Sequence, residues 1–198
     1  VGVPVGAGGG RAEGRLPVAT TALDNRGGTL ASRSGDVTLD AAVIDNREGG
    51  RLVASRDLLF QSAVLNNAGG TVYATRNLSY ENAAGTLDNA GGQFGAGDTT
   101  RLTLAQIGNG DGGRIQSGTL WLAVPTLDTT GGEITANVLH ALLVSLTGGG
   151  RLYGAQWLDL AFSGDFIYDN GLSLESDGRL DLSVAGTFTN RGTLETAA

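Results

Sequence analysis

A unit of about 20 residues recurs along this chain of 198 residues, and the repeat restricts its fold more than any other feature does. Each clear copy has an aliphatic residue, then Asp or Asn, then Asn, one or two further residues and Gly-Gly. Successive copies begin at Leu23, Ile44, Leu65 and Leu87 and, in weaker form, at Ile107, Leu127, Leu146, Tyr168 and Phe188. A constant period over nearly the whole chain predicts stacked, equivalent turns of backbone.

Apolar residues within each unit follow a strand pattern. One residue after each Gly-Gly stands an apolar side chain, and a second segment follows in which apolar residues lie two apart. Such alternation is typical of strands with one side chain inside and the next outside. The first set is Leu30, Leu52, Val72, Phe94, Ile115, Ile134, Leu152 and Leu174. The pairs of the second set are Val37/Leu39, Leu58/Phe60, Leu78/Tyr80, Leu102/Leu104, Leu120/Leu122, Leu158/Leu160 and Leu180/Leu182.

The repeat predicts an all-β fold, a right-handed parallel β-helix (solenoid) of about nine coils with a period of about 20–21 residues. A single unit buries too few side chains to offset the entropy of ordering its backbone, so the units are stable only when stacked. At strand spacing near 4.8 Å, nine coils form a rod roughly 43 Å long. We expect the solenoid over residues 16–198, with residues 1–15 as a degenerate first coil or a loose tail. The longer consensus of leucine-rich repeats is missing.

Composition excludes several classes of function. The chain has no cysteine, which excludes disulfides, thiol nucleophiles and metal sites with cysteine ligands. Its formal net charge of −7 argues against nucleic acid as a partner. No apolar run is long enough for a membrane-spanning helix, so we expect no membrane insertion. We also expect no cofactor and no metal, because the repeat lacks the nine-residue pattern of calcium-binding β-rolls.

The Asn of the repeat predicts a structural column along the rod. In a solenoid, equivalent positions stack, and stacked carboxamides hydrogen-bond from one coil to the next. The same positions serve the turns, because Asn and Gly tolerate positive φ. The predicted column consists of Asn25, Asn46, Asn67, Asn89 and Asn109, and it resumes at Asn170 and Asn190.

Aromatic residues that break the repeat form the one candidate binding patch. The outward position of the second strand is expected to hold Thr103, Trp121 and His140 on successive coils, followed by Asp159 and Asp181. An exposed Trp next to His and further aromatic residues is typical of a surface that stacks on sugars or anchors a protein partner. Packing of Trp121 on neighbouring coils is the alternative interpretation. The candidate patch is Trp121, His140, Tyr153 and Trp157.

An enzyme is the remote alternative, since some right-handed β-helices degrade polysaccharides. Stacked Asp159 and Asp181 would lie roughly 5 Å apart. Regular solenoids place like charges in columns without any catalytic role, however, and His140 is the only histidine. No nucleophile motif accompanies it, and no long insertion builds a cleft. We therefore predict no catalytic residues.

The repeat units resemble the haemagglutinin repeats of filamentous-haemagglutinin-type exoproteins. The resemblance is clearest in the segments that begin at Leu23 and Thr86, which read LDNRGGTLAS and TLDNAGGQF. These exoproteins are the large secreted partners of bacterial two-partner secretion systems, and they include adhesins and contact-dependent growth-inhibition toxins. The resemblance covers residues 16–198. It implies a filament secreted to the outer surface of a Gram-negative cell through an outer-membrane transporter.

The resemblance also sets the expected function. The chain begins and ends within a repeat, and it lacks the Asn-Pro-Asn-Gly-type motif of the family's secretion domain, so we expect a piece of a longer filament. The first hypothesis is a structural stalk that presents a distal adhesive or toxic module. The alternative is that these coils themselves bind a receptor or glycan. We expect a monomeric rod, with end-to-end association of open coil ends as an added option.

Overall fold

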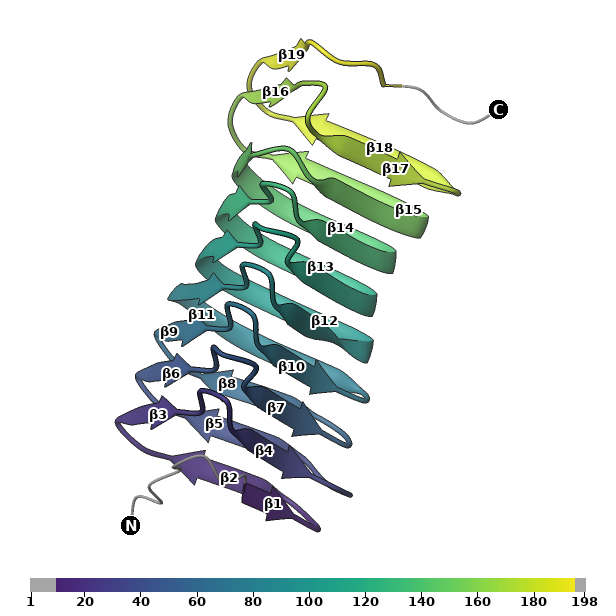
Figure 1. Cartoon of the computed structure of the whole chain (residues 1–198). Helices are drawn as coiled ribbons and strands as arrows, with labels where there is room; N and C mark the ends of the chain where they lie inside the picture. The colour runs from purple at the N-terminus through teal and green to yellow at the C-terminus, as the bar shows by residue number, and fades with distance from the viewer. Residues whose placement is uncertain (1–9, 195–198) are drawn as a thin grey trace.

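The computed structural model describes residues 10–194, and every regular element in this range is a β-strand. The strands wind into about nine stacked turns, which follow one another from the N-terminal to the C-terminal end of the rod (Figure 1). All pairings between neighbouring turns are parallel, from the first strand to the last. The predicted parallel β-solenoid and its period are thereby confirmed.

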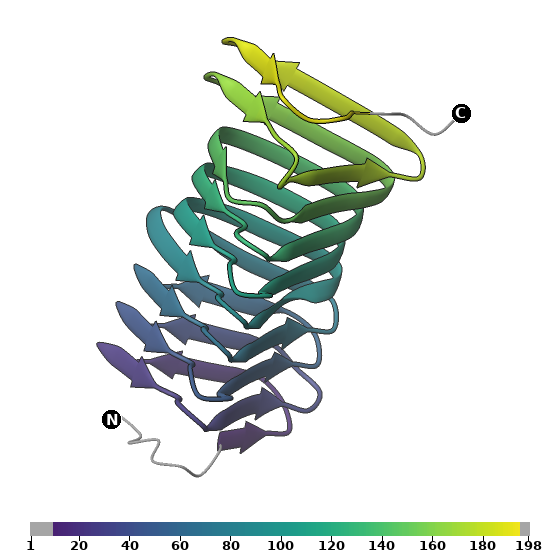
Figure 2. The ribbon, with the colours of Figure 1, turned by 45° about the horizontal axis from the view of Figure 1, so that its top comes forward.

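The first three turns each contain three short strands, and each strand begins a new face of the rod. A turned view shows the successive turns stacked on one another (Figure 2). These strands are β1 (Gly10–Ala12), β2 (Leu16–Ala19), β3 (Ala22–Asp24), β4 (Thr29–Ser32), β5 (Val37–Asp40), β6 (Val43–Asp45), β7 (Arg51–Ala54), β8 (Leu58–Gln61) and β9 (Val64–Asn66).

In the middle turns the corners between faces become extended, so that neighbouring strands merge. The separate first strand of the fourth turn is β10, and β11 joins the second and third strands of that turn. Each of the next three strands runs through all three faces. These elements are β10 (Thr71–Ala74), β11 (Asn77–Asp88), β12 (Gln93–Gly108), β13 (Arg114–Asp128) and β14 (Glu133–Thr147).

The last two turns are less continuous. The third-face strands of these turns pair only with each other, in a two-stranded sheet separate from the main one. The strands are β15 (Arg151–Phe162), β16 (Phe166–Tyr168), β17 (Ser173–Ser176), β18 (Arg179–Val184) and β19 (Phe188–Asn190). The rod is therefore a single hydrogen-bonded stack up to β14, and its third face is interrupted after that strand.

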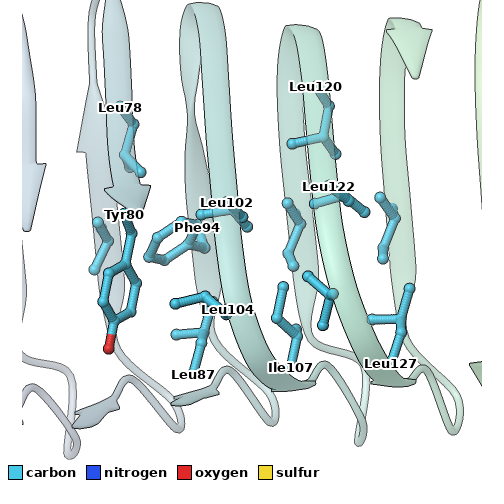
Figure 3. Close-up of a cluster of buried hydrophobic side chains, with 14 of the residues drawn as sticks. Leu78, Tyr80, Leu87, Phe94, Leu102, Leu104, Ile107, Leu120, Leu122 and Leu127 are labelled. Carbon is cyan, nitrogen blue, oxygen red and sulfur yellow. The ribbon is translucent and has the colours of Figure 1, made fainter. Parts of the chain in front are cut away.

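The core is a continuous file of aliphatic and aromatic side chains inside the rod. Figure 3 shows how successive turns contribute equivalent residues, such as Leu87, Ile107 and Leu127 on the third face. The ring of Phe60 packs near those of Tyr80 and Phe94, whose centroids lie 5.5 Å and 6.1 Å from its own. Each inward residue stacks on the inward residues at the same position of the neighbouring turns. Strand alternation is therefore enough to separate core from surface.

One turn departs from the register that its apolar pattern predicts. Leu102 pairs with Leu122, and Thr100 pairs with Leu120. The position aligned with Leu120 is therefore Thr100, and the buried Leu102 and Leu104 occupy the next two inward positions of this turn. Thr100 is fully buried, and its hydroxyl has no hydrogen-bond partner among the described residues. A polar residue at a core position hid the true register.

The N-terminal segment joins the stack before residue 16. Strand β1 pairs with β4, so that Gly10 aligns with Leu30. Residues 10–12 are therefore part of the first turn, while the rest of the predicted tail, residues 1–9, lies outside the described range. Within residues 10–194 no helix has the length and apolar character needed to cross a membrane.

Candidate functional site

The Asn side chains of the repeat form one hydrogen-bonded column at the turn before the first face. In each step the amide nitrogen Nδ2 of one Asn donates to Oδ1 of the Asn one turn later. The four distances are 2.6 Å for Asn25 to Asn46 and 2.7 Å for Asn46 to Asn67, Asn67 to Asn89 and Asn89 to Asn109. All five residues are buried. Each Nδ2 also donates to backbone carbonyls, as Asn67 does to Gln93 at 3.0 Å, so the column ties neighbouring turns together.

The second Gly of each repeat is required by this column. A β-carbon on Gly50 would lie 2.5 Å from the carbonyl oxygen of Asn25 and 2.6 Å from Oδ1 of Asn46. The first Gly is required for its backbone conformation, since Gly69 has a φ of 65°. L-residues with side chains rarely adopt that conformation. The Gly-Gly pair therefore combines a backbone requirement with a packing requirement.

The column ends earlier than the sequence predicts. Thr129 follows Asn109 and is buried in the next position of the column, so Nδ2 of Asn109 donates only to the backbone carbonyl oxygens of Gly113 and Glu133. The expected resumption at Asn170 and Asn190 is wrong. Both side chains are exposed, and the register aligns Asn190 with Tyr168, two positions away from Asn170. Two residues in different columns cannot stack on each other.

Exposed ion pairs border the column at the same turn. Nη2 of Arg26 lies 2.8 Å from Oδ2 of Asp24, and the hydrogen bonds from Arg26 lower the pKa of the Asp24 carboxyl to about 2. Arg47 binds Asp45 in the same way at 2.7 Å and lowers its pKa. These pairs lie at the surface, so their interaction with water limits what they add to stability.

Three residues of the predicted aromatic patch lie together on the second face. Trp121 and His140 are paired positions on β13 and β14, and their rings stack with centroids 4.0 Å apart and planes 19° apart. The ring of Trp157, from β15, is nearly perpendicular to that of His140, with centroids 4.7 Å apart and planes 79° apart. Register alone brings the first two together, because both occupy the outward position between two core residues.

Carboxylates hold this cluster from the C-terminal side. Nδ1 of His140 lies 2.9 Å from Oδ2 of Asp159, the next residue in the same column. Nε1 of Trp157 donates to Asp181 at 2.7 Å, and Arg179 also binds Asp181. Both carboxylates considered for catalysis are thus engaged with cluster residues. Among residues 10–194, no group of three or more His, Asp or Glu side chains is placed to bind a metal.

Tyr153 does not belong to the cluster. It lies on the first face, in register with Thr135 and Glu175. Its hydroxyl donates to Asp177, which raises the pKa of the phenol, and the guanidinium of Arg151 lies 4.5 Å from the ring centroid. The sequence placed Tyr153 on the same turn as Trp157 but had no means to show that the chain passes a corner between them.

The outward column on the N-terminal side of Trp121 holds Arg101, not Thr103. Arg101 pairs with Trp121, while Thr103 pairs with Ala123 in the parallel column. The error arises because Thr100, a polar residue, occupies the inward position that aligns with Leu120. A shallow groove of about 450 Å³ runs over both columns, and its floor includes Leu142, which is 55% exposed. Arg101 and Leu142 were missed from the sequence, although the blurred alternation around Leu142 was a signal of an apolar outward residue.

Comparison with known proteins agrees with this architecture. A family model described as haemagglutinin repeat matches residues 152–198. Over 182 residues, or 91% of the chain, the sequence is 33% identical to the deoxyribonuclease CdiA of Dickeya dadantii (strain 3937). The chain belongs to the haemagglutinin-repeat family. It spans only 5% of the length of that relative. No solved structure matches the chain significantly.

Membership confirms the resemblance drawn from the repeat motif. The chain is a repeat region of a two-partner-secretion exoprotein. It is secreted and lies at the cell surface. The family model matches the C-terminal turns, where the Asn column is missing. The matched segment contains Asn170 and Asn190, whose side chains are exposed instead of stacked in a column.

Proposed function

We propose that this haemagglutinin-repeat region is a structural stalk segment that holds a distal adhesive or toxic module of its exoprotein away from the cell. The observation that carries the proposal is the parallel pairing of each turn with the next along the rod, reinforced by the buried Asn column. At about 4.8 Å per turn, the described stack is about 40 Å long. In such a rod each turn is held by its neighbouring turns, so the rod keeps its two ends apart without a globular partner.

The contacts between turns also support the route of export in this proposal. An outer-membrane transporter passes the parent chain, and the turns then fold one after another outside the cell. Each turn packs on the turn before it, so folding proceeds locally along the rod. This segment has no cysteine, so no disulfide within it forms before passage.

The test is made in the parent exoprotein, displayed on bacteria. Residues 43–63 are duplicated, which adds one turn in register because Val43 pairs with Val64. A stalk tolerates this insertion, so we expect normal surface display and at least half of the parent activity on target cells. A matched insertion of the same 21 residues in scrambled order, which has no register, is expected to lose display. Loss of activity in the duplicated protein at normal display would contradict the stalk proposal.

A further inference from the structure

The groove on the second face crosses five successive turns. Its lining comes from β11 to β15, and the register arranges these residues in two outward columns. At the strand spacing of a sheet, four steps make the groove about 19 Å long, parallel to the rod. The first column is Arg101, Trp121, His140 and Asp159, and the second is Glu81, Thr103, Ala123, Leu142 and Ala161.

Trp121 is a preorganised platform in this groove. His140 stacks on one face of the indole, and Asp159 fixes the His140 ring from the other side. Trp121 is nevertheless 44% exposed. Since its column neighbours lie on either side along the rod, the free face of the indole is directed toward Arg101. A fixed aromatic ring loses little conformational entropy when a ligand binds.

The floor beside Trp121 is flat and apolar, and the end of the groove is polar. Ala123 and Ala161 flank Leu142 in the second column, so small side chains leave the indole accessible from that side. Glu81 and Arg101 supply an acceptor and a donor at the N-terminal end. Among the described residues Arg101 forms no ion pair, whereas Glu81 accepts a hydrogen bond from Ser79 at 2.7 Å.

The surroundings select the chemistry of the occupant. The backbone groups of these strands are already paired with the turns on both sides, so an extended peptide cannot add as a strand here. The chain carries a net charge of −7, and the carboxylates of Glu81 and Asp159 line the groove, which disfavours polyanions. An exposed indole with a donor and an acceptor at its margin fits a ring that has apolar C–H faces and hydroxyl groups at its rim.

We propose that this groove binds a neutral hexose oligosaccharide, one pyranose ring of which stacks on the free face of Trp121. Arg101 and Glu81 hydrogen-bond to its hydroxyl groups. This activity is independent of the stalk function, because a rod serves as a stalk whether or not the groove is occupied.

The test is isothermal titration calorimetry of the purified chain with cellohexaose, maltohexaose and mannohexaose, and with a chondroitin sulfate hexasaccharide. We expect saturable binding of at least one neutral hexasaccharide and none of the sulfated one. Trp121→Ala should weaken that binding at least about tenfold, which corresponds to about 1.4 kcal/mol. Arg101→Gln should weaken it less. Circular dichroism establishes that each variant keeps the β fold.

Trp157→Phe is the matched control. Its indole lies behind His140 and outside the groove lining, so binding should be retained. Because the chain has two tryptophans, the fluorescence of this variant reports Trp121 alone, and ligand should change it. Absence of binding to all three neutral glycans, unchanged binding by folded Trp121→Ala, or preference for the sulfated glycan would each overturn the proposal. None of these results bears on tolerance of an added turn, the measurement that tests the stalk.

Discussion

The turns that carry the Asn column and the turns that follow it are built on the same repeat but are held together differently. From Asn25 to Asn109, each turn adds a buried side-chain hydrogen bond to the backbone pairing. From Thr129 onward that bond is absent, and β16 and β19 separate from the main sheet. The rod can therefore continue on strand pairing and apolar stacking alone, while the polar column adds a fixed register to the turns that contain it.

The Gly position shows the same difference. Gly70, Gly92 and Gly113 are aligned, and each lies against an Asn of the column. In the last turn the aligned residue is Leu172, which is buried. The aligned Gly150, one turn earlier, still has no room for a side chain, because a β-carbon there would overlap the carbonyl oxygen of Thr129. The spacing of the repeat is thus more general than its Asn and Gly residues.

The largest effect is expected where Gly and Asn meet. In Gly70→Ala the new β-carbon overlaps the carbonyl oxygen of Asn46, and the turn must shift. We expect the free energy of unfolding to fall by about 3 kcal/mol. Gly171→Ala in the last turns is the control, since its β-carbon meets nothing closer than 3.4 Å. Chemical denaturation measures both. Equal losses would show that the Asn column does not distinguish the two regions.

Removing one carboxamide should have the next largest effect. Asn67→Ala removes the bond from Nδ2 of Asn46 to Oδ1 of Asn67 and leaves the buried Oδ1 of Asn89 without its donor. We expect a loss of about 2 kcal/mol, because buried groups without hydrogen bonds are costly. Asn170→Ala, at an exposed position outside the column, should change stability by less than about 0.5 kcal/mol. If Asn67→Ala left the free energy of unfolding unchanged, the column would not contribute to the stability of the fold.

A stabilising change is expected within the column region itself. Thr100→Val replaces a buried hydroxyl that has no hydrogen-bond partner among the described residues with a methyl group of similar size. We expect the free energy of unfolding to rise by about 1 kcal/mol. Thr103→Val, on the exposed side of the same strand, controls for strand propensity. A destabilised Thr100→Val would indicate that a buried water satisfies this hydroxyl.

The smallest effect concerns pH, and it applies to both regions. The pKa of Asp24 is lowered from 3.8 to about 2 by Arg26, and Arg151 lowers that of Glu175. A carboxyl whose pKa is depressed by folding stabilises above its unfolded pKa. For Asp24 this contribution is lost as the pH falls from about 3.8 to about 2. Carboxyl titration by NMR should show Arg26→Gln raising the pKa of Asp24, whereas Arg33→Gln should leave it unchanged.

The site was less predictable than the fold because it depends on how individual pairs of turns are aligned. Trp121 and His140 were correctly placed on one face, since a fixed period puts equivalent positions on neighbouring turns. Tyr153 was wrongly grouped with them, because sequence distance does not show where a turn bends around a corner. Arg101 was missed for another reason: a buried Thr100 breaks the apolar pattern that sets which neighbours point outward.

The sequence by itself determined the architecture of this protein: parallel turns of about 20 residues, an interior of alternating apolar side chains and a polar column at one turn. Those properties repeat, so each copy supports the same inference about the others. Only the tertiary structure decided where the column ends, which face carries Tyr153 and how Trp121 is held by His140 and Asp159. These depend on a shift of one or two residues within a turn, and such shifts leave the period of the chain unchanged.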